Sequence, residues 1–106
     1  MNRSALERKA EALAHYDRMI VWAESQPPND CASSDTMRSE LGEAWFASYC
    51  IYCQEFMHGM YVCVNCPLNS DNGCCGGKWY AMDSTKTWEE WVYYAKRVRS
   101  YIKKHG

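Results

Sequence analysis

The sequence predicts an all-α fold of about three helices, with an irregular metal-binding loop between the second helix and the last. Three observations predict this class: apolar residues recur at helical spacing near both ends of the chain, a capping box opens each of these segments, and two CxxC pairs lie between them. A length of 106 residues suits one folding unit. We therefore expect a single helical, metal-stapled domain over residues 1–106.

The composition favours a folded domain without membrane contact. Five Trp and eight Tyr supply large rings that bury much area per residue. The chain has no apolar run long enough to span a bilayer, and its first residues lack the apolar region of a signal peptide. We therefore expect a cytoplasmic location, where closely paired cysteines are more often metal ligands than disulfides.

The first helix is expected to begin at the capping box Ser4 to Glu7 and to end at Pro27-Pro28. Its predicted core-facing row consists of Leu6, Ala10, Leu13, Ile20 and Val21. Asp17 would project near the centre of this row, where an unpaired carboxylate is costly, so we expect it to have a Tyr, Arg or backbone amide partner. A catalytic or ligand-binding role is the alternative. His15 lies off the row and is expected at the surface.

A turn-rich stretch over residues 27–35 leads to a second predicted helix, with Ser33, Ser34 or Asp35 as its N-cap. The apolar residues expected in this helix are Met37, Leu41, Trp45 and Phe46. Gly42 weakens the helical pattern. Farther along, residues 69–73 indicate a polar turn, because Asn-Gly favours positive φ.

Two identical cysteine pairs are the most informative feature of the chain, and together they comprise Cys50, Cys53, Cys63 and Cys66. Two such knuckles ten residues apart can close around one tetrahedral ion, so we expect these four residues to hold Zn²⁺. A closed four-thiolate site leaves no coordination position for a substrate, which favours a structural role. An iron–sulfur cluster or a redox dithiol is the alternative. His58, between the pairs, is expected to be a spacer residue.

The last helix has the clearest pattern, because a capping box from Thr87 to Glu90 opens it and an apolar row follows. That row consists of Trp88, Trp91, Ala95, Val98 and Ile102. The basic side chains of this segment occupy the opposite arc of the helix. Aromatic and arginine side chains dominate binding at many interfaces, so we predict a partner surface made of Tyr94, Arg97, Tyr101 and Lys104.

The cysteine core resembles that of small cysteine-rich proteins of tailed bacteriophages, in which CxxC, CxxC-Pro-Leu and Cys-x-Gly-x-x-Tyr follow one another. The last of these motifs matches residues 75–80. The resemblance makes Cys75 a candidate additional metal ligand, and a partly buried free thiol is the alternative. Cys31 and Cys74 have no place in the family pattern, and Trp79 stands where a Pro is common.

The sequence contains no catalytic motif: there is no Ser-His-Asp order, no phosphate-binding Gly-rich loop and no HExxH. We therefore expect a protein that binds rather than catalyses. The phage resemblance implies an accessory protein that inhibits or redirects a host factor, with anti-defence proteins included in this class. One alternative is a nucleic-acid-binding zinc module that uses the basic last helix, although the net charge of −1 disfavours it. The other alternative is an iron–sulfur or redox protein.

Overall fold

The computed structural model describes residues 4–56, 66–70 and 73–106. The described residues form five α-helices, which are α1 (Ala5–Glu24), α2 (Ser34–Leu41), α3 (Ile51–Phe56), α4 (Lys78–Asp83) and α5 (Trp88–His105). Two short 3₁₀ turns, Ala47–Tyr49 and Cys75–Gly77, and the two-residue strands β1 (Asn69–Ser70) and β2 (Gly73–Cys74) complete them. The mostly helical fold confirms the predicted class, but not the predicted number of helices.

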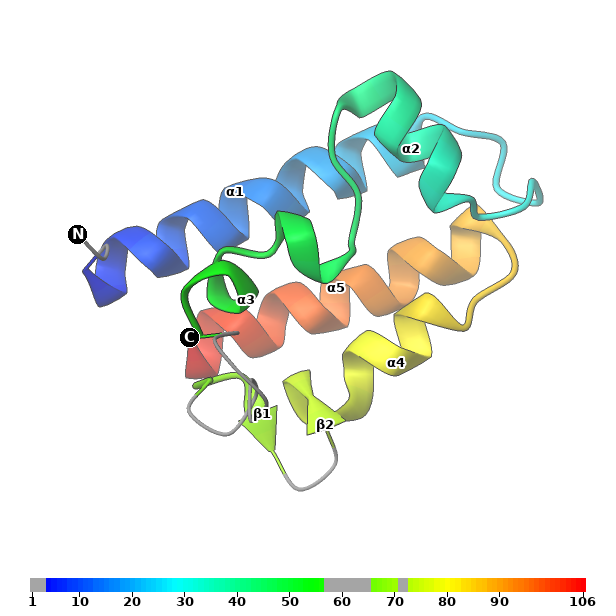
Figure 1. Ribbon diagram of the computed structural model, residues 1–106. Helices are drawn as coiled ribbons and strands as arrows, with labels where there is room; N and C mark the ends of the chain where they lie inside the picture. The colour runs from blue at the N-terminus through cyan, green and yellow to red at the C-terminus, as the bar shows by residue number, and fades with distance from the viewer. Residues whose placement is uncertain (1–3, 57–65, 71–72) are drawn as a thin grey trace.

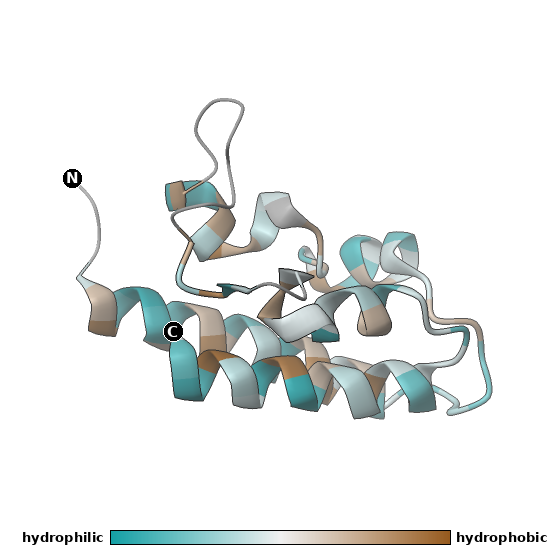
Figure 2. Cartoon of the chain, turned by 90° about the horizontal axis from the view of Figure 1, so that it is seen from below, coloured by the Kyte–Doolittle hydropathy of each residue, from teal (hydrophilic) through white to brown (hydrophobic). Residues whose placement is uncertain are grey.

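The two long helices lie side by side and run in opposite directions (Figure 1). Two ion pairs join them, one between Asp17 and Arg99 with an N–O distance of 2.5 Å, the other between Glu24 and Lys96 at 3.2 Å. The short helices and the hairpin of β1 and β2 lie on one side of this helix pair (Figure 2). α1 and α5 therefore form one layer, and the short elements form a second layer over it.

The register of α1 differs from the sequence prediction. The residues it buries are Ala12, His15, Tyr16, Met19, Ile20 and Ala23. Of the predicted row only Ile20 is buried, whereas Leu6 and Val21 are 81% and 68% exposed. The predicted row is therefore wrong by a rotation about the helix axis. The side chains of Tyr16 and Met19 fill the core, and small residues on the same face let α1 approach its neighbours closely.

This rotation also overturns the expected positions of Asp17 and His15, although Asp17 does have an arginine partner, as expected. Asp17 is not buried in the core, since its side chain is 53% exposed, and its partner is the Arg99 guanidinium of α5. His15 is not at the surface, since it is only 6% exposed and its Nδ1 is hydrogen-bonded to Glu43 Oε1. Glu43 in turn accepts hydrogen bonds from Arg18 at 2.8 and 2.9 Å. The buried polar group of α1 is thus an imidazole with a carboxylate partner.

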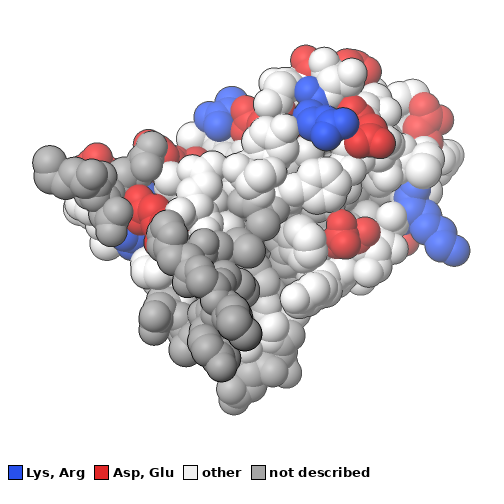
Figure 3. Space-filling view, viewed as in Figure 1, with Lys and Arg blue, Asp and Glu red and all other residues white. Residues whose placement is uncertain are grey.

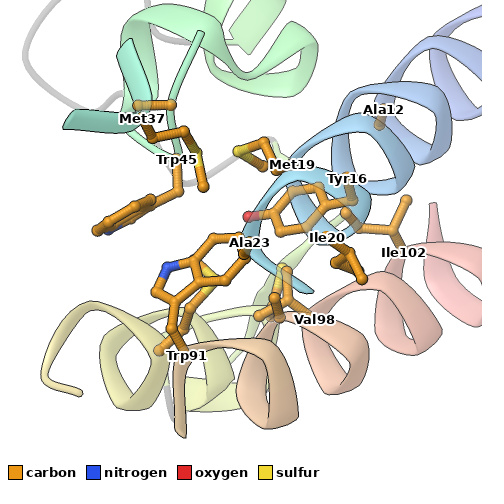
Figure 4. Close-up of a cluster of buried hydrophobic side chains, with 14 of the residues drawn as sticks. Ala12, Tyr16, Met19, Ile20, Ala23, Met37, Trp45, Trp91, Val98 and Ile102 are labelled. Carbon is orange, nitrogen blue, oxygen red and sulfur yellow. The ribbon is translucent and has the colours of Figure 1, made fainter. Parts of the chain in front are cut away.

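α5 has the predicted start and the predicted core row. The Thr87 hydroxyl accepts from the amide of Glu90 at 3.3 Å, as a capping box requires. All five residues of the predicted row are buried. Trp91 packs against Trp45 with ring centroids 5.0 Å apart, and side chains from α1 and α2 close around this pair (Figure 4). The core therefore lies between the α1–α5 layer and the short elements.

α2 begins as predicted but ends earlier. Ser33 is the N-cap, and its hydroxyl accepts from the amide of Thr36 at 3.3 Å. Gly42 adopts φ = 84° and closes the helix with its amide bonded to Arg38 O at 3.0 Å, so Trp45 and Phe46 fall outside it. α1 likewise ends at Glu24, before the two prolines.

Candidate functional site

The first cysteine pair is positioned by the start of α3. Cys50 immediately precedes this helix, and its carbonyl oxygen accepts from the amide of Gln54 at 2.9 Å. A hydrogen bond from the Cys53 thiol, together with the backbone amides of Cys53 and Tyr52, lowers the pKa of Cys50 to about 7 against the effect of burial. The same thiol pairing and burial raise the pKa of Cys53. One member of this pair therefore ionises readily, and the other keeps its proton.

Cys74 and Cys75 form a second pair of thiols at the end of the hairpin. β1 and β2 are antiparallel, with Asn69 opposite Cys74, and the Cys75 amide donates to Leu68 O at 2.7 Å. The two sulfur atoms are 3.8 Å apart. The hydrogen bond between them lowers the pKa of Cys74 and raises that of Cys75, whose burial acts in the same upward direction.

Cys75 lies in an unusual backbone conformation. Its φ is +53°, and among the described residues the other positive φ angles belong to glycines, including Gly76 at 65° and Gly77 at 83°. A left-handed conformation is unfavourable for a residue with a Cβ atom. Its side chain is nevertheless only 1% exposed and belongs to the hydrophobic core. The turn thus holds the Cys75 thiol inward at a cost in backbone strain.

Five cysteines gather in one region, which we call the thiol cluster: Cys50, Cys53, Cys66, Cys74 and Cys75. Beyond their thiol hydrogen bonds and burial, charges on Cys50, Cys66 and Cys74 raise the pKa of Cys53 and of Cys75, so each of these two thiols lies within electrostatic range of the other three. Tyr16 of α1 lies within electrostatic range of the cluster. Burial raises the pKa of its hydroxyl, and charges on the cysteines of the cluster raise it further. The cluster thus comprises cysteines from the start of α3 and from the residues before, in and just after the hairpin.

The structure describes three of the four predicted zinc ligands and leaves the predicted set untested. Cys50, Cys53 and Cys66 belong to the thiol cluster, whereas Cys63 and also His58 lie outside the described residues. Within the described ranges, no three Cys, His, Asp or Glu side chains are placed closely enough to hold an ion. The prediction of a four-thiolate zinc site therefore stays a prediction.

Sequence reasoning left open whether Cys74 joins the other cysteines. The phage pattern has no position for Cys74, yet its sulfur contacts that of Cys75. The feature that positions Cys74 is the hairpin. Cys74 ends its second strand, and the amide of the next residue, Cys75, donates to Leu68 O. Cys31, by contrast, is exposed and pairs through its backbone with Thr87, so it takes no part in the cluster.

A groove of about 570 Å³ on α5 brings together most of the predicted partner surface. We call it the basic groove, and its principal lining residues are Lys78, Tyr93, Lys96, Arg97, Tyr101 and Lys104. Tyr94 does not line the groove, because it is turned toward the core and packs against it. Tyr93 takes its place: it is 56% exposed, and its hydroxyl accepts from Arg97 Nη1 at 3.2 Å.

Positive charge is concentrated along this groove. None of the described residues that line it is acidic, and the ammonium of Lys78 lies 5.2 Å from the ring centroid of Tyr101. Residues 91–106 contain five of the twelve Lys and Arg residues and none of the thirteen Asp and Glu. Both signs of charge are interspersed on the described part of the face shown in Figure 3. The groove therefore attracts anionic groups locally, although the chain as a whole is slightly acidic.

Comparison of the chain with protein-family models, with curated proteins and with solved structures finds no match. Within the described residues, no helix combines the length and the apolar character needed to cross a membrane.

Proposed function

We propose that this protein is a non-enzymatic binding module that holds one zinc ion and acts on a host factor through the basic groove. The observation that carries the proposal is the groove itself, which combines four cationic side chains with two tyrosine rings. Tyrosine and arginine are enriched among the residues that dominate the free energy of binding at protein interfaces. The groove therefore suits a protein partner with an acidic surface.

The resemblance of residues 50–80 to phage cysteine-rich proteins supports a partner from the host cell, including a component of a defence system. Binding to this partner would inhibit or redirect it. This step rests on the biological setting of the family, whereas the place of contact rests on the groove.

The zinc part of the proposal rests on the chemistry of the donors. Thiolate sulfur binds zinc at about 2.3 Å, so two ligands of a tetrahedral ion lie about 3.8 Å apart. Cys50, Cys53 and Cys66, with the predicted Cys63, would hold the ion, and Cys75 is the candidate additional donor. A bound zinc ion would cross-link α3 to residues 66–70 and stabilise the fold.

Elemental analysis of the purified protein tests the metal directly. We expect one zinc per chain and no iron, with loss of zinc in Cys50→Ser and full retention in Cys31→Ser, because Cys31 is exposed and outside the cluster. A brown protein that contains iron and sulfide would instead identify an iron–sulfur cluster.

Capture of the partner tests the groove. Arg97→Ala combined with Tyr93→Ala removes two exposed groove side chains, and we expect capture from a host-cell lysate to weaken by more than about tenfold. The matched control is Arg38→Ala with Tyr80→Ala, which removes the same two residue types from exposed positions outside the groove. Equal capture by both double variants would argue against the groove.

A nucleic-acid partner is the second candidate, because the groove presents cations beside aromatic rings, as single-strand binding surfaces do. Titration of a labelled single-stranded oligonucleotide at several salt concentrations distinguishes the two. Affinity that falls steeply with salt, and is lost in the groove variant, would favour nucleic acid. Absence of binding at low salt would eliminate it.

A further inference from the structure

Cys74 and Cys75 are adjacent in the chain, and their thiols are in contact, with the two sulfur atoms 3.8 Å apart. Successive side chains of an extended chain point to opposite faces, so adjacent cysteines usually hold their thiols apart. The contact between these two thiols therefore requires a departure from regular extended geometry at one of the two residues.

The backbone of Cys75 supplies this departure. Cys74 is extended, with φ = −61° and ψ = 129°, and Cys75 follows with φ = +53°. These angles resemble those of the two central residues of a type II turn, whose second central position requires positive φ and is usually glycine. Glycine would remove the strain at this position but would also remove the thiol. Backbone strain of this kind concentrates at functional sites.

The two thiols differ in their access to solvent. Cys75 is only 1% exposed and belongs to the hydrophobic core, whereas Cys74, at the end of β2, is half-buried. The Cys75 amide donates to Leu68 O at 2.7 Å, which fixes the backbone of the pair. A small reagent in solution therefore reaches the sulfur of Cys74 first, and the sulfur of Cys75 lies beside it. This is the arrangement of an attacking thiol and a resolving thiol.

We propose that Cys74 and Cys75 form a two-electron redox site that reacts with low-molecular-weight disulfides. The Cys74 thiolate attacks one sulfur atom of the reagent and releases the other half as a thiolate, which leaves a mixed disulfide on Cys74. The Cys75 thiolate then attacks the Cys74 sulfur and releases the second half. The two protein thiols lose two electrons and two protons, the reagent is reduced to two thiols, and a disulfide bond joins the adjacent cysteines.

The disulfide formed in this way is strained and therefore easily reduced. Adjacent Cα atoms are about 3.8 Å apart, whereas residues joined by a disulfide usually have Cα atoms about 4.4–6.8 Å apart. Gly76, which follows the pair with φ = 65°, can absorb the backbone adjustment because it has no Cβ atom. The inference does not rest on the proposed function, because it uses neither the four predicted zinc ligands nor the basic groove.

Incubation of the full chain with excess oxidised glutathione, without oxygen, tests this inference. Alkylation and mass spectrometry then count the free thiols, and peptide fragmentation locates any attached glutathione. We expect the unmodified protein to lose two thiols at the pair and to retain no glutathione there. Cys75→Gly lacks the resolving thiol and should retain one glutathione on Cys74. Cys74→Ala should show neither change at the pair, because Cys75 is buried.

Both substitutions suit the local backbone, so circular dichroism should show unchanged helicity in both variants. Excess reduced glutathione should restore both thiols of the unmodified protein, because the bond is strained. Cys31 is the internal control: it is exposed and outside the thiol cluster, so it should retain glutathione in all three proteins.

Three results would overturn the proposal. The first is a pair whose thiols both stay free while Cys31 reacts. The second is a loss of two thiols that persists in Cys74→Ala and in Cys75→Gly, because the disulfide would then join other cysteines. The third is glutathione retained on Cys74 of the unmodified protein, because Cys75 would then not resolve the mixed disulfide.

Discussion

His15 is a buried imidazole whose protonation state links the stability of the fold to pH. Burial lowers its pKa below the ordinary value of 6.5, although the hydrogen bond to Glu43 acts in the opposite direction. The pKa of Glu43 is also lowered: burial opposes this shift, but the hydrogen bonds from Arg18 and His15 outweigh it. Below neutral pH, the unfolded chain therefore binds protons at both positions before the folded protein does, so acid favours unfolding.

We expect the free energy of unfolding to fall as the pH is lowered below about 6.5, first through His15 and then, at lower pH, through Glu43. Urea unfolding between pH 7.5 and 5.5 measures the first part. His15→Gln keeps a hydrogen-bonding side chain that does not titrate, so its stability should change less over this interval. Parallel pH profiles for the two proteins would show that His15 does not titrate as described.

The left-handed backbone at Cys75 makes a second prediction at the scale of one residue. A residue with a Cβ atom in this conformation costs about 1–2 kcal/mol relative to its usual geometry, whereas glycine adopts it freely. Cys75→Gly should therefore be more stable than Cys75→Ala by roughly 1 kcal/mol, the reverse of the usual order. Since both variants lack the thiol, any effect on a bound metal is shared.

The neighbouring residue provides the control for this comparison. Cys74 has φ = −61°, which alanine adopts without strain. Cys74→Ala should therefore be more stable than Cys74→Gly. Chemical denaturation of the four variants gives both differences. The same order at both positions would mean that the strain at Cys75 is absent.

Gly42 determines where α2 ends. It has φ = 84° and its amide completes the last hydrogen bond of the helix, while a Cβ atom added there would meet no atom within 4 Å. Gly42→Ala should therefore cost about 1 kcal/mol through backbone strain alone. Gly42→Asn should cost less, because asparagine tolerates the left-handed region. Equal losses of thermal stability in the two variants would point to a steric cause instead.

The helices differ in how far their sequences predict them. In α5, one apolar row repeats at helical spacing opposite an arc of basic residues, so Trp91, Val98 and Ile102 identify the core row. In α1, apolar residues occur on two faces, and periodicity alone does not distinguish the row that α5 and the short elements cover from the exposed face with Leu6 and Val21. α3 and α4 have six residues each, which is too short for a helical period to be recognised.

At the scale of the whole molecule, the candidate site depends on contacts that no local pattern contains. The CxxC spacing predicts that Cys50 and Cys53 act together, and the structure agrees. That Cys74 comes within electrostatic range of Cys50 depends on the hairpin, which no CxxC spacing predicts. The sequence predicts more of the basic groove than of the thiol cluster, because one helix provides most of the groove. A helical projection places Arg97 and Lys104 on one face of that helix.

The two layers should respond differently to the removal of a bound metal ion. α1 and α5 are joined by the tryptophan-rich core and by two ion pairs, so their contact does not depend on the thiol cluster. α3 has only six residues and the strands have two each, and the cysteines of the cluster lie in or near these short elements. We therefore expect a zinc chelator to speed hydrogen exchange of the amides in α3 and in residues 66–75, while the central amides of α1 and α5 stay protected.

Cys50→Ser should reproduce the effect of the chelator on hydrogen exchange, and Cys31→Ser should not, because Cys31 is exposed and outside the cluster. Exchange that accelerates equally in all helices would mean that the metal supports the whole fold rather than one layer. Exchange that is unchanged everywhere would mean that the thiol cluster holds no metal that contributes to stability. Because hydrogen exchange reports each element separately, it distinguishes these outcomes where a single unfolding curve does not.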